Sequence, residues 1–110
     1  MSEKRRAIRK DVATDLPVTD VNTGRVVGEL VNISSAGFML FAATPLAPHS
    51  VFQLSLQIPK PVRGIDTLYF GAECLWCSPA DRPDRYWIGF HLIDISQQEH
   101  EALEYFVESV

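Results

Sequence analysis

The strict alternation of apolar and polar residues between Phe52 and Ile58 is the feature that most limits how this chain can fold. Phe52, Leu54, Leu56 and Ile58 are separated by single glutamine or serine residues. A period of two places the apolar side chains on one face of a β-strand, whereas a helix would spread them around its circumference. The run therefore predicts a strand with one face in a core and the other in water.

Five further segments have the composition and spacing of strands. They span residues 16–21, 25–33, 38–42, 68–77 and 85–93. The breaks between them are rich in Gly, Pro, Asn and Ser, and we expect Pro59, Pro61 and Gly64 to end the alternating strand. With the run at 52–58, these segments predict six β-strands.

The period changes near the C-terminus. Residues 96–99 read Ser-Gln-Gln-Glu, a capping box in which hydroxyl and carboxylate satisfy free backbone donors reciprocally. Leu103, Phe106, Val107 and Val110 follow at helical spacing, which predicts an amphipathic helix over residues 96–109. In a chain of 110 residues, this predicts one domain, all-β with a C-terminal helix: a six-stranded antiparallel β-barrel with the helix over one opening or side.

Charge divides the chain into two parts. Residues 1–10 hold five Lys and Arg against one Glu, a net charge of +4, so the other hundred residues carry −8 of the total of −4. We therefore predict a flexible basic arm at 1–11 on a barrel domain at 12–110. Such an arm is often only a solvated tail, and the second usual interpretation is a nucleic-acid contact. Because the acidic body would repel a long polyanion, a small anion held by the arm is easier to reconcile with this charge distribution.

Two short patterns carry the functional information. Arg5 and Arg9 are spaced as Arg-x-x-x-Arg, and Asn32, Ser34 and Gly37 as Asn-x-Ser-x-x-Gly. Guanidinium groups bind phosphate oxygens in forked, planar geometry, an amide can bond a guanine edge, and Gly permits close approach. The second pattern alone would be an ordinary turn, but together the two indicate a site for a small guanine-containing phosphodiester.

The two patterns together resemble the signature of the PilZ domain, the bacterial receptor module for cyclic di-GMP. That signature is Arg-x-x-x-Arg followed by Asp/Asn-x-Ser-x-x-Gly. The C-terminal third adds to the resemblance, because three segments read like the family's last two strands and the entry to its final helix: Ala72-x-Cys74-x-Trp76, residues 86–92 and Asp94-Ile95-Ser96. The resemblance covers nearly the whole chain and implies the same PilZ-like barrel.

The resemblance also implies a ligand and its contacts. The ligand would be cyclic di-GMP, with no cofactor and no metal. The implied binding residues are Arg5, Arg6, Arg9, Asn32, Ser34 and Gly37, with Lys4 and Trp76 as weaker candidates. In the family the residue before the first motif arginine selects one bound nucleotide or a stacked pair, and the cation Lys4 favours two.

The predicted role is that of a receptor rather than an enzyme, since no nucleophile elbow, phosphate loop or acid–base pair is present. We expect ligand to order the arm and to relay the signal to an unknown output protein in trans, in the cytoplasm, without DNA, RNA or membrane insertion. The absence of an apolar leader or a long apolar run underlies that location. The alternatives are a nucleotide-independent adaptor of the same fold and a small single-stranded nucleic-acid binder.

Cys74 and Cys77 form a Cys-x-x-Cys pattern, which in other settings binds zinc or performs redox chemistry. Here the pair falls inside an expected strand, where an odd offset sends the side chains to opposite faces. We therefore predict no metal or redox chemistry at this pair.

Overall fold

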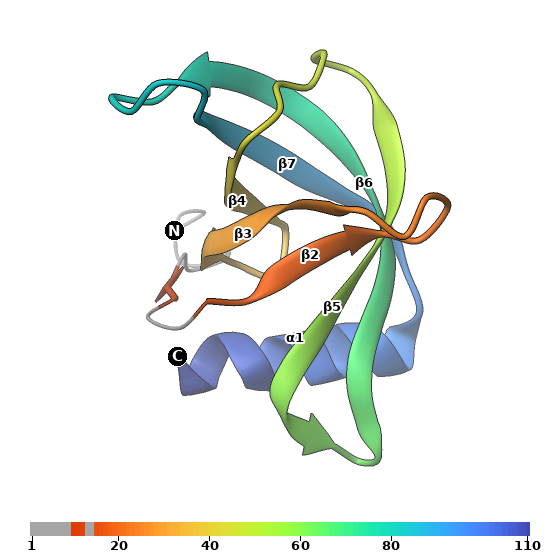
Figure 1. The fold of residues 1–110 in the computed structure, drawn as a ribbon. Coiled ribbons are helices and arrows are strands. Elements are labelled where there is room, and N and C mark those ends of the chain that lie inside the picture. The colour runs from red at the N-terminus through yellow and green to blue at the C-terminus, as the bar shows by residue number, and fades with distance from the viewer. Residues whose placement is uncertain (1–9, 13–14) are drawn as a thin grey trace, which may run out of the picture.

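A computed structural model describes residues 10–12 and 15–110. These residues form seven strands and one helix, which Figure 1 shows as a curled sheet above a single helix. The elements are β1 (Lys10–Asp11), β2 (Pro17–Asp20), β3 (Val26–Ile33), β4 (Gly37–Ala42), β5 (Val51–Val62), β6 (Ile65–Pro79), β7 (Tyr86–Ile95) and α1 (Gln97–Ser109). The predicted six strands and the C-terminal helix are confirmed, and β1 is an additional two-residue strand.

The sheet closes into an antiparallel barrel of six strands. Its order is β3-β2-β5-β6-β7-β4, and β4 returns to pair with β3. β2 pairs with the first half of β3, from Val26 to Glu29, and β1 pairs with the end of β3, at Asn32 and Ile33. β4 lies along one side of β3. On the other side, β2 pairs with the first half of β3 and β1 pairs with its end.

The barrel interior is a single apolar core. Leu54, Leu56 and Ile58 are at most 3% exposed, so the alternating run faces inward as predicted. Phe38 and Phe90 stack at the centre with ring centroids 4.9 Å apart. Closed barrels have no free edge, so the inward residues of every strand pack on one another.

The helix is tied to the barrel at its N-terminus. The Ser96 hydroxyl accepts a hydrogen bond from the Glu99 backbone N–H (3.1 Å), as the capping box predicts. The Glu99 carboxylate, however, accepts from the Ser96 hydroxyl (2.9 Å) and from the backbone N–H of Tyr69 in β6 (2.8 Å). The cap therefore also fixes α1 to the sheet. Within the described residues, no helix is both long and apolar enough to cross a membrane.

The expectation that Pro59 and Pro61 end their strand is wrong. β5 runs on to Val62, and the chain turns at Arg63 and Gly64, which both have positive φ (52° and 81°). Beyond Leu56, β5 has no partner on its β2 side, so no neighbouring strand there requires an N–H donor. Proline is tolerated on such an edge, and the two-residue turn matches the twist of a hairpin.

Candidate functional site

The short strand β1 brings the end of the basic segment beside the second motif. Lys10 pairs with Ile33, and Asp11 pairs with Asn32. The backbone N–H of Val12 then donates to the carbonyl of Val31 (2.9 Å). Residues 10–12 therefore lie beside residues 31–33, although about twenty residues separate them in the sequence. The predicted contacts Lys4, Arg5, Arg6 and Arg9 lie outside the described residues.

Asn32 belongs to a row of residues that crosses the outer face of the barrel. It pairs with Met39 in β4, Met39 pairs with Gly89 in β7, and Gly89 pairs with Trp76 in β6. Residues paired across an antiparallel sheet point to the same face, and three strand spacings amount to about 14 Å. The structure thus places two of the predicted candidates, Asn32 and Trp76, on one surface.

Two β-bulges produce this alignment. The registers of β3 with β4 and of β6 with β7 slip by one residue, at Val31 and at Leu75 respectively. A bulge leaves two consecutive residues on one face. Leu30 and Ile33 point into the core, so Val31 and Asn32 both lie on the outside.

Trp76 lies flat across its neighbour in the row. A Cβ built on Gly89 would be 2.3 Å from the Trp76 Nε1 atom, so only glycine accommodates the indole ring there. Trp76 is nevertheless 42% exposed. It therefore offers an aromatic surface, supported by the sheet and open to solvent, on which a base can stack.

The Ser34–Gly37 turn is held rigidly by Ser34, which is only 2% exposed. Its hydroxyl donates to the carbonyl of Gly37 and accepts from the N–H groups of Ala36 and Gly37, each at 3.2 Å. A hydroxyl has one donor and two acceptor positions, and all three are used within the turn. Direct contact between Ser34 and a phosphate requires one of these bonds to be exchanged.

Gly37 is required by the packing of the turn on β7. A Cβ at this position would be 2.4 Å from the carbonyl oxygen of Phe90. The carbonyl of Ala36 also accepts from the N–H of Leu92 (2.9 Å). The glycine of the motif therefore permits a close approach of two strands, which explains it without a ligand.

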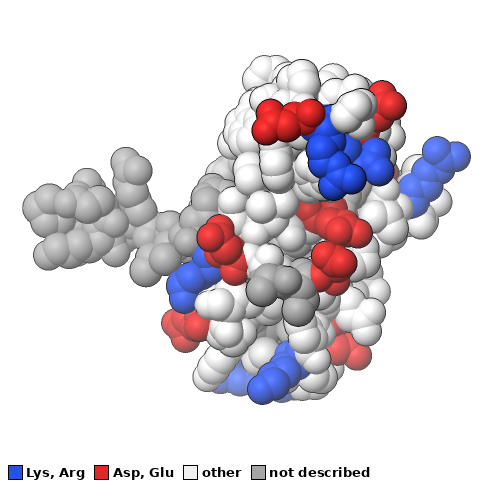
Figure 2. Space-filling model, turned by 60° about the vertical axis from the view of Figure 1, so that its left-hand side comes forward, with Lys and Arg blue, Asp and Glu red and all other residues white. Residues whose placement is uncertain are grey.

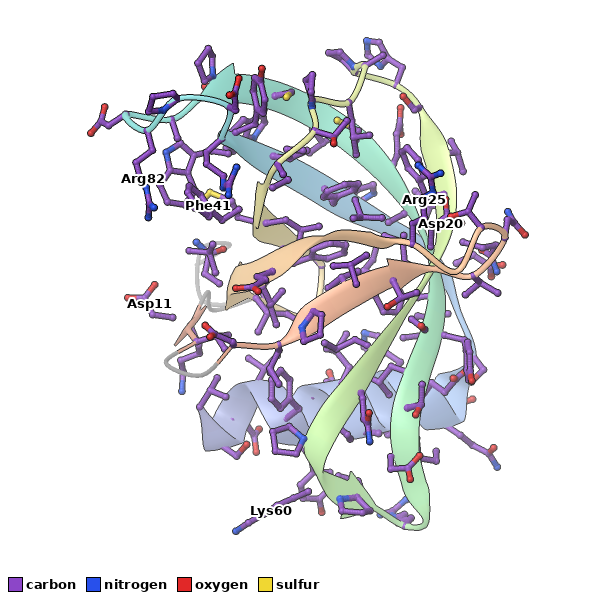
Figure 3. All side chains as sticks on the ribbon, viewed as in Figure 1. Asp11, Asp20, Arg25, Phe41, Lys60 and Arg82 are labelled. Carbon is purple, nitrogen blue, oxygen red and sulfur yellow. The ribbon has the colours of Figure 1, made fainter. Side chains whose placement is uncertain are left out.

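On the side of the barrel that carries β1, the middle of the described surface is acidic. Figure 2 shows Asp and Glu side chains gathered there, with Lys and Arg side chains above and below them. Figure 3 places Asp11 and Phe41 on this side of the barrel and Asp20 and Arg25 at the other end of the sheet. An anion bound on this face therefore needs cations beyond those that the described residues supply at its centre.

The expectation that Cys74 and Cys77 point to opposite faces is wrong. The bulge at Leu75 adds one residue, so that Cys74 pairs with Phe90 and Cys77 with Ile88, both of which face the core. Burial raises the pKa of the Cys74 thiol, and the neighbouring Cys77 raises it further. Cys74 is thus a buried core thiol, and the absence of metal or redox chemistry at this pair stays a prediction.

A family model described as the PilZ domain matches residues 3–109, and the chain belongs to that family. The fold agrees with three solved structures, each covering 96% of this chain. The inhibitor of motility MotI/DgrA of Bacillus subtilis has a TM-score of 0.73 at 15% identity. The PilZ domain of YcgR from Escherichia coli with c-di-GMP has a TM-score of 0.71 at 16% identity. The YcgR protein in complex with c-di-GMP has a TM-score of 0.70 at 16% identity.

This chain spans 50% of the Bacillus protein, 90% of the isolated YcgR domain and 45% of the YcgR chain in the third structure. No curated protein sequence matches it. At these identities the three structures establish a shared fold.

Proposed function

We propose that this PilZ domain is a receptor for cyclic di-GMP. The observation that carries the proposal is the pairing of Lys10 and Asp11 with Ile33 and Asn32, which brings the residues directly after the first motif beside the start of the second. Two of the similar structures are described as complexes with this nucleotide, which supports the same ligand here. The ligand would lie on the outer face along the row from Asn32 to Trp76.

The proposed contacts divide by chemistry. Arg5 and Arg9 bind the phosphates through charge-assisted, forked hydrogen bonds, and Arg6 and Lys4 add positive charge. Asn32 bonds a guanine edge, and Trp76 stacks on a base. Because the acidic centre of this face repels phosphate, the basic arm is what makes the surface attractive to a dianion.

We propose that Ser34 and Gly37 shape the site rather than contact the ligand directly. The Ser34 hydroxyl holds the turn, and Gly37 lets the turn pack on β7, so that both residues position Asn32 and the backbone beside it. Ser34 touches phosphate only if the ligand displaces one of its three bonds. A loss of affinity in Ser34→Ala is therefore expected together with a loss of stability.

The output of the proposed receptor is a change of surface. Ligand phosphates neutralise the like charges of the arm and hold it against β3, which alters the face offered to a partner protein in trans in the cytoplasm. We infer no catalytic step. The second candidate, an adaptor that binds protein without nucleotide, is favoured by the turn itself, since Ser34 and Gly37 are fully explained by packing.

Calorimetric titration with cyclic di-GMP tests the proposal, with a single-stranded oligonucleotide and the adenine analogue as comparisons. We expect saturable binding of cyclic di-GMP, weaker binding of the adenine analogue and none of the oligonucleotide. Asn32→Ala is expected to weaken cyclic di-GMP binding by about tenfold, within the value of a bidentate pair to a base edge, and to cost less affinity for the adenine analogue. No heat with cyclic di-GMP would favour the adaptor.

A further inference from the structure

A small open pocket lies directly beside the proposed nucleotide row. It has a volume of about 260 Å³, and its walls include Phe41, Trp87, Glu29 and Asp15. Sites that enclose a drug-sized ligand usually measure about 300–1,000 Å³. The pocket is therefore sized for one part of a larger ligand.

The sheet register fixes the position of the pocket relative to Asn32. Phe41 follows Met39 by two residues in β4, and Trp87 precedes Gly89 by two residues in β7. Phe41 and Trp87 pair with each other, and Glu29 pairs with Phe41. They form the next outward row of the same face, about 7 Å along the strands from the row of Asn32.

The pocket combines an aromatic wall with carboxylates. The rings of Phe41 and Trp87 have centroids 4.7 Å apart and are tilted by 50°, and both side chains are half-buried. Glu29 and Asp15 are exposed, and neither forms an ion pair with any cation in the part of the chain that the structure describes. Among the residues that the structure describes, no Lys or Arg lines the pocket.

The described lining of the pocket disfavours a phosphate and fits a purine base. Two carboxylates without a cation repel an anion, whereas an aromatic face stacks on any base. Guanine presents adjacent N1–H and N2–H donors, and an ionised carboxylate is an acceptor with two oxygens. Adenine lacks this pair of donors, so Glu29 also gives the pocket a means of distinguishing the two purines.

We propose that Phe41, Trp87 and Glu29 form a second base subsite, which takes a guanine beside the one at Asn32. The proposal rests on the proposed function, because it assumes a guanine nucleotide on this face. The guanine comes either from the other half of the same cyclic dinucleotide or from a second nucleotide. Both sources present the same base edge to Glu29.

The two tryptophans of the chain allow each site to be observed separately. In Trp76→Phe, Trp87 is the sole tryptophan and reports on the subsite; in Trp87→Phe, Trp76 reports on the Asn32 row. We expect saturating cyclic di-GMP to quench emission in both variants, with calorimetry on each confirming that nucleotide is bound. Quenching at Trp76 without any change at Trp87 would overturn the subsite alone, and the absence of binding heat in wild type and both variants would overturn the receptor function with it.

Calorimetry on Phe41→Ala and Glu29→Gln identifies the source of the base. A fall in molar ratio from two to one assigns the subsite to a second nucleotide, and a fall in affinity at a constant ratio assigns it to the same nucleotide. For Glu29→Gln we expect about tenfold weaker cyclic di-GMP binding, the value of one charge-assisted hydrogen bond. Tyr105→Ala, which removes an exposed aromatic on α1, serves as the control. Unchanged affinity and ratio in both variants would reject the subsite.

Discussion

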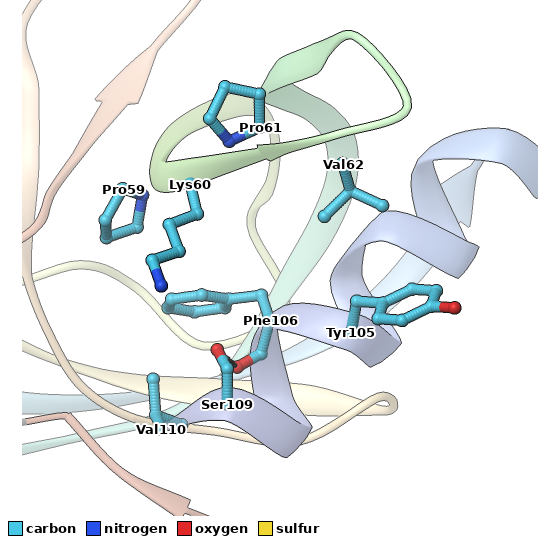
Figure 4. A pocket seen from close by; sticks show the side chains of 8 residues that line it. All are labelled: Pro59, Lys60, Pro61, Val62, Tyr105, Phe106, Ser109 and Val110. Atoms are coloured by element: carbon cyan, nitrogen blue, oxygen red, sulfur yellow. Dashed lines mark hydrogen bonds between the residues drawn. The ribbon is translucent and has the colours of Figure 1, made fainter.

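The two ends of this domain attach to the same barrel by different forces. The C-terminal helix buries Ala102, Leu103, Phe106 and Val107 against β5 and β6. Figure 4 shows Phe106 of α1 pointing toward Lys60 and Pro59 of β5, whereas Tyr105 points away from them. At the N-terminal end, the described attachment is short: Lys10 and Asp11 pair with β3 through the backbone, and Val12 adds one hydrogen bond and a partly buried side chain, next to a highly basic sequence.

The difference indicates which end is structural and which responds to ligand. Burial of apolar area stabilises α1 without any partner and is not screened by salt as contacts between charges are. A basic segment is held by charge, either by the acidic surface beside it or by an anion that it binds, and this attraction weakens with salt. We therefore expect changes in the helix to alter stability, and changes in the arm to alter binding. The predictions below test this separation, beginning with the largest effect.

Deletion of residues 97–110 should have the largest effect on the molecule. It exposes the apolar surface of β5 and β6 and removes the Glu99 tie to Tyr69, so we expect aggregation or a large fall in the thermal midpoint by circular dichroism. Phe106→Ala tests the same contact in a chain that still folds, with a loss of about 3–5 kcal/mol in unfolding free energy. Tyr105→Ala should change it little. A truncated chain with an unchanged midpoint would show that α1 is not structural.

Arg5→Ala and Arg9→Ala should affect binding and leave stability unchanged. Each removes charge-assisted bonds worth about 1.5–3 kcal/mol, so calorimetry should show cyclic di-GMP binding weakened about tenfold to a hundredfold. Arg25→Ala is the matched control, because it removes the same charge at the far end of the sheet. The thermal midpoint without ligand should be that of the wild type in all three variants. Equal affinity in all of them would remove the arm from the site.

Glu99→Gln should produce a smaller loss, confined to stability. The amide oxygen can replace only part of what the carboxylate accepts from Ser96 and Tyr69. We expect about 0.5–1.5 kcal/mol less unfolding free energy in urea, the value of an ordinary hydrogen bond. Nucleotide affinity should not change. A loss of affinity without a loss of stability would mean that the helix end communicates with the ligand face.

Lys4→Leu should have the smallest energetic effect, and its readout is the molar ratio. We propose that the cation at this position supports the phosphates of a second nucleotide, which an apolar side chain would displace. Calorimetry at high protein concentration should give two nucleotides per chain in the wild type and one in Lys4→Leu. Affinity should fall steeply with added salt, because the contacts are ionic and partly exposed. A ratio of one in both proteins would end this role for Lys4.

Much of the fold could be predicted because its signals are local. The alternation from Phe52 to Ile58 gave a strand with the correct inner face, and Ser96 with Glu99 marked the start of the helix. Both signals depend on spacing within a few residues. The prediction from Pro59 and Pro61 was wrong because its outcome is not local. A proline ends a strand only where a neighbouring strand needs an N–H donor at that position, and that neighbour is remote in sequence.

The sequence by itself determined the family, the order of strands and helix, and the candidate motif residues. Only the tertiary structure decided which of those residues share a surface. The bulges at Val31 and Leu75 put Asn32 and Trp76 on one outer row and turn Cys74 and Cys77 to one inner face. A one-residue slip in register exchanges the faces of every later residue, and register is set by pairing between distant strands, which spacing along one strand does not encode.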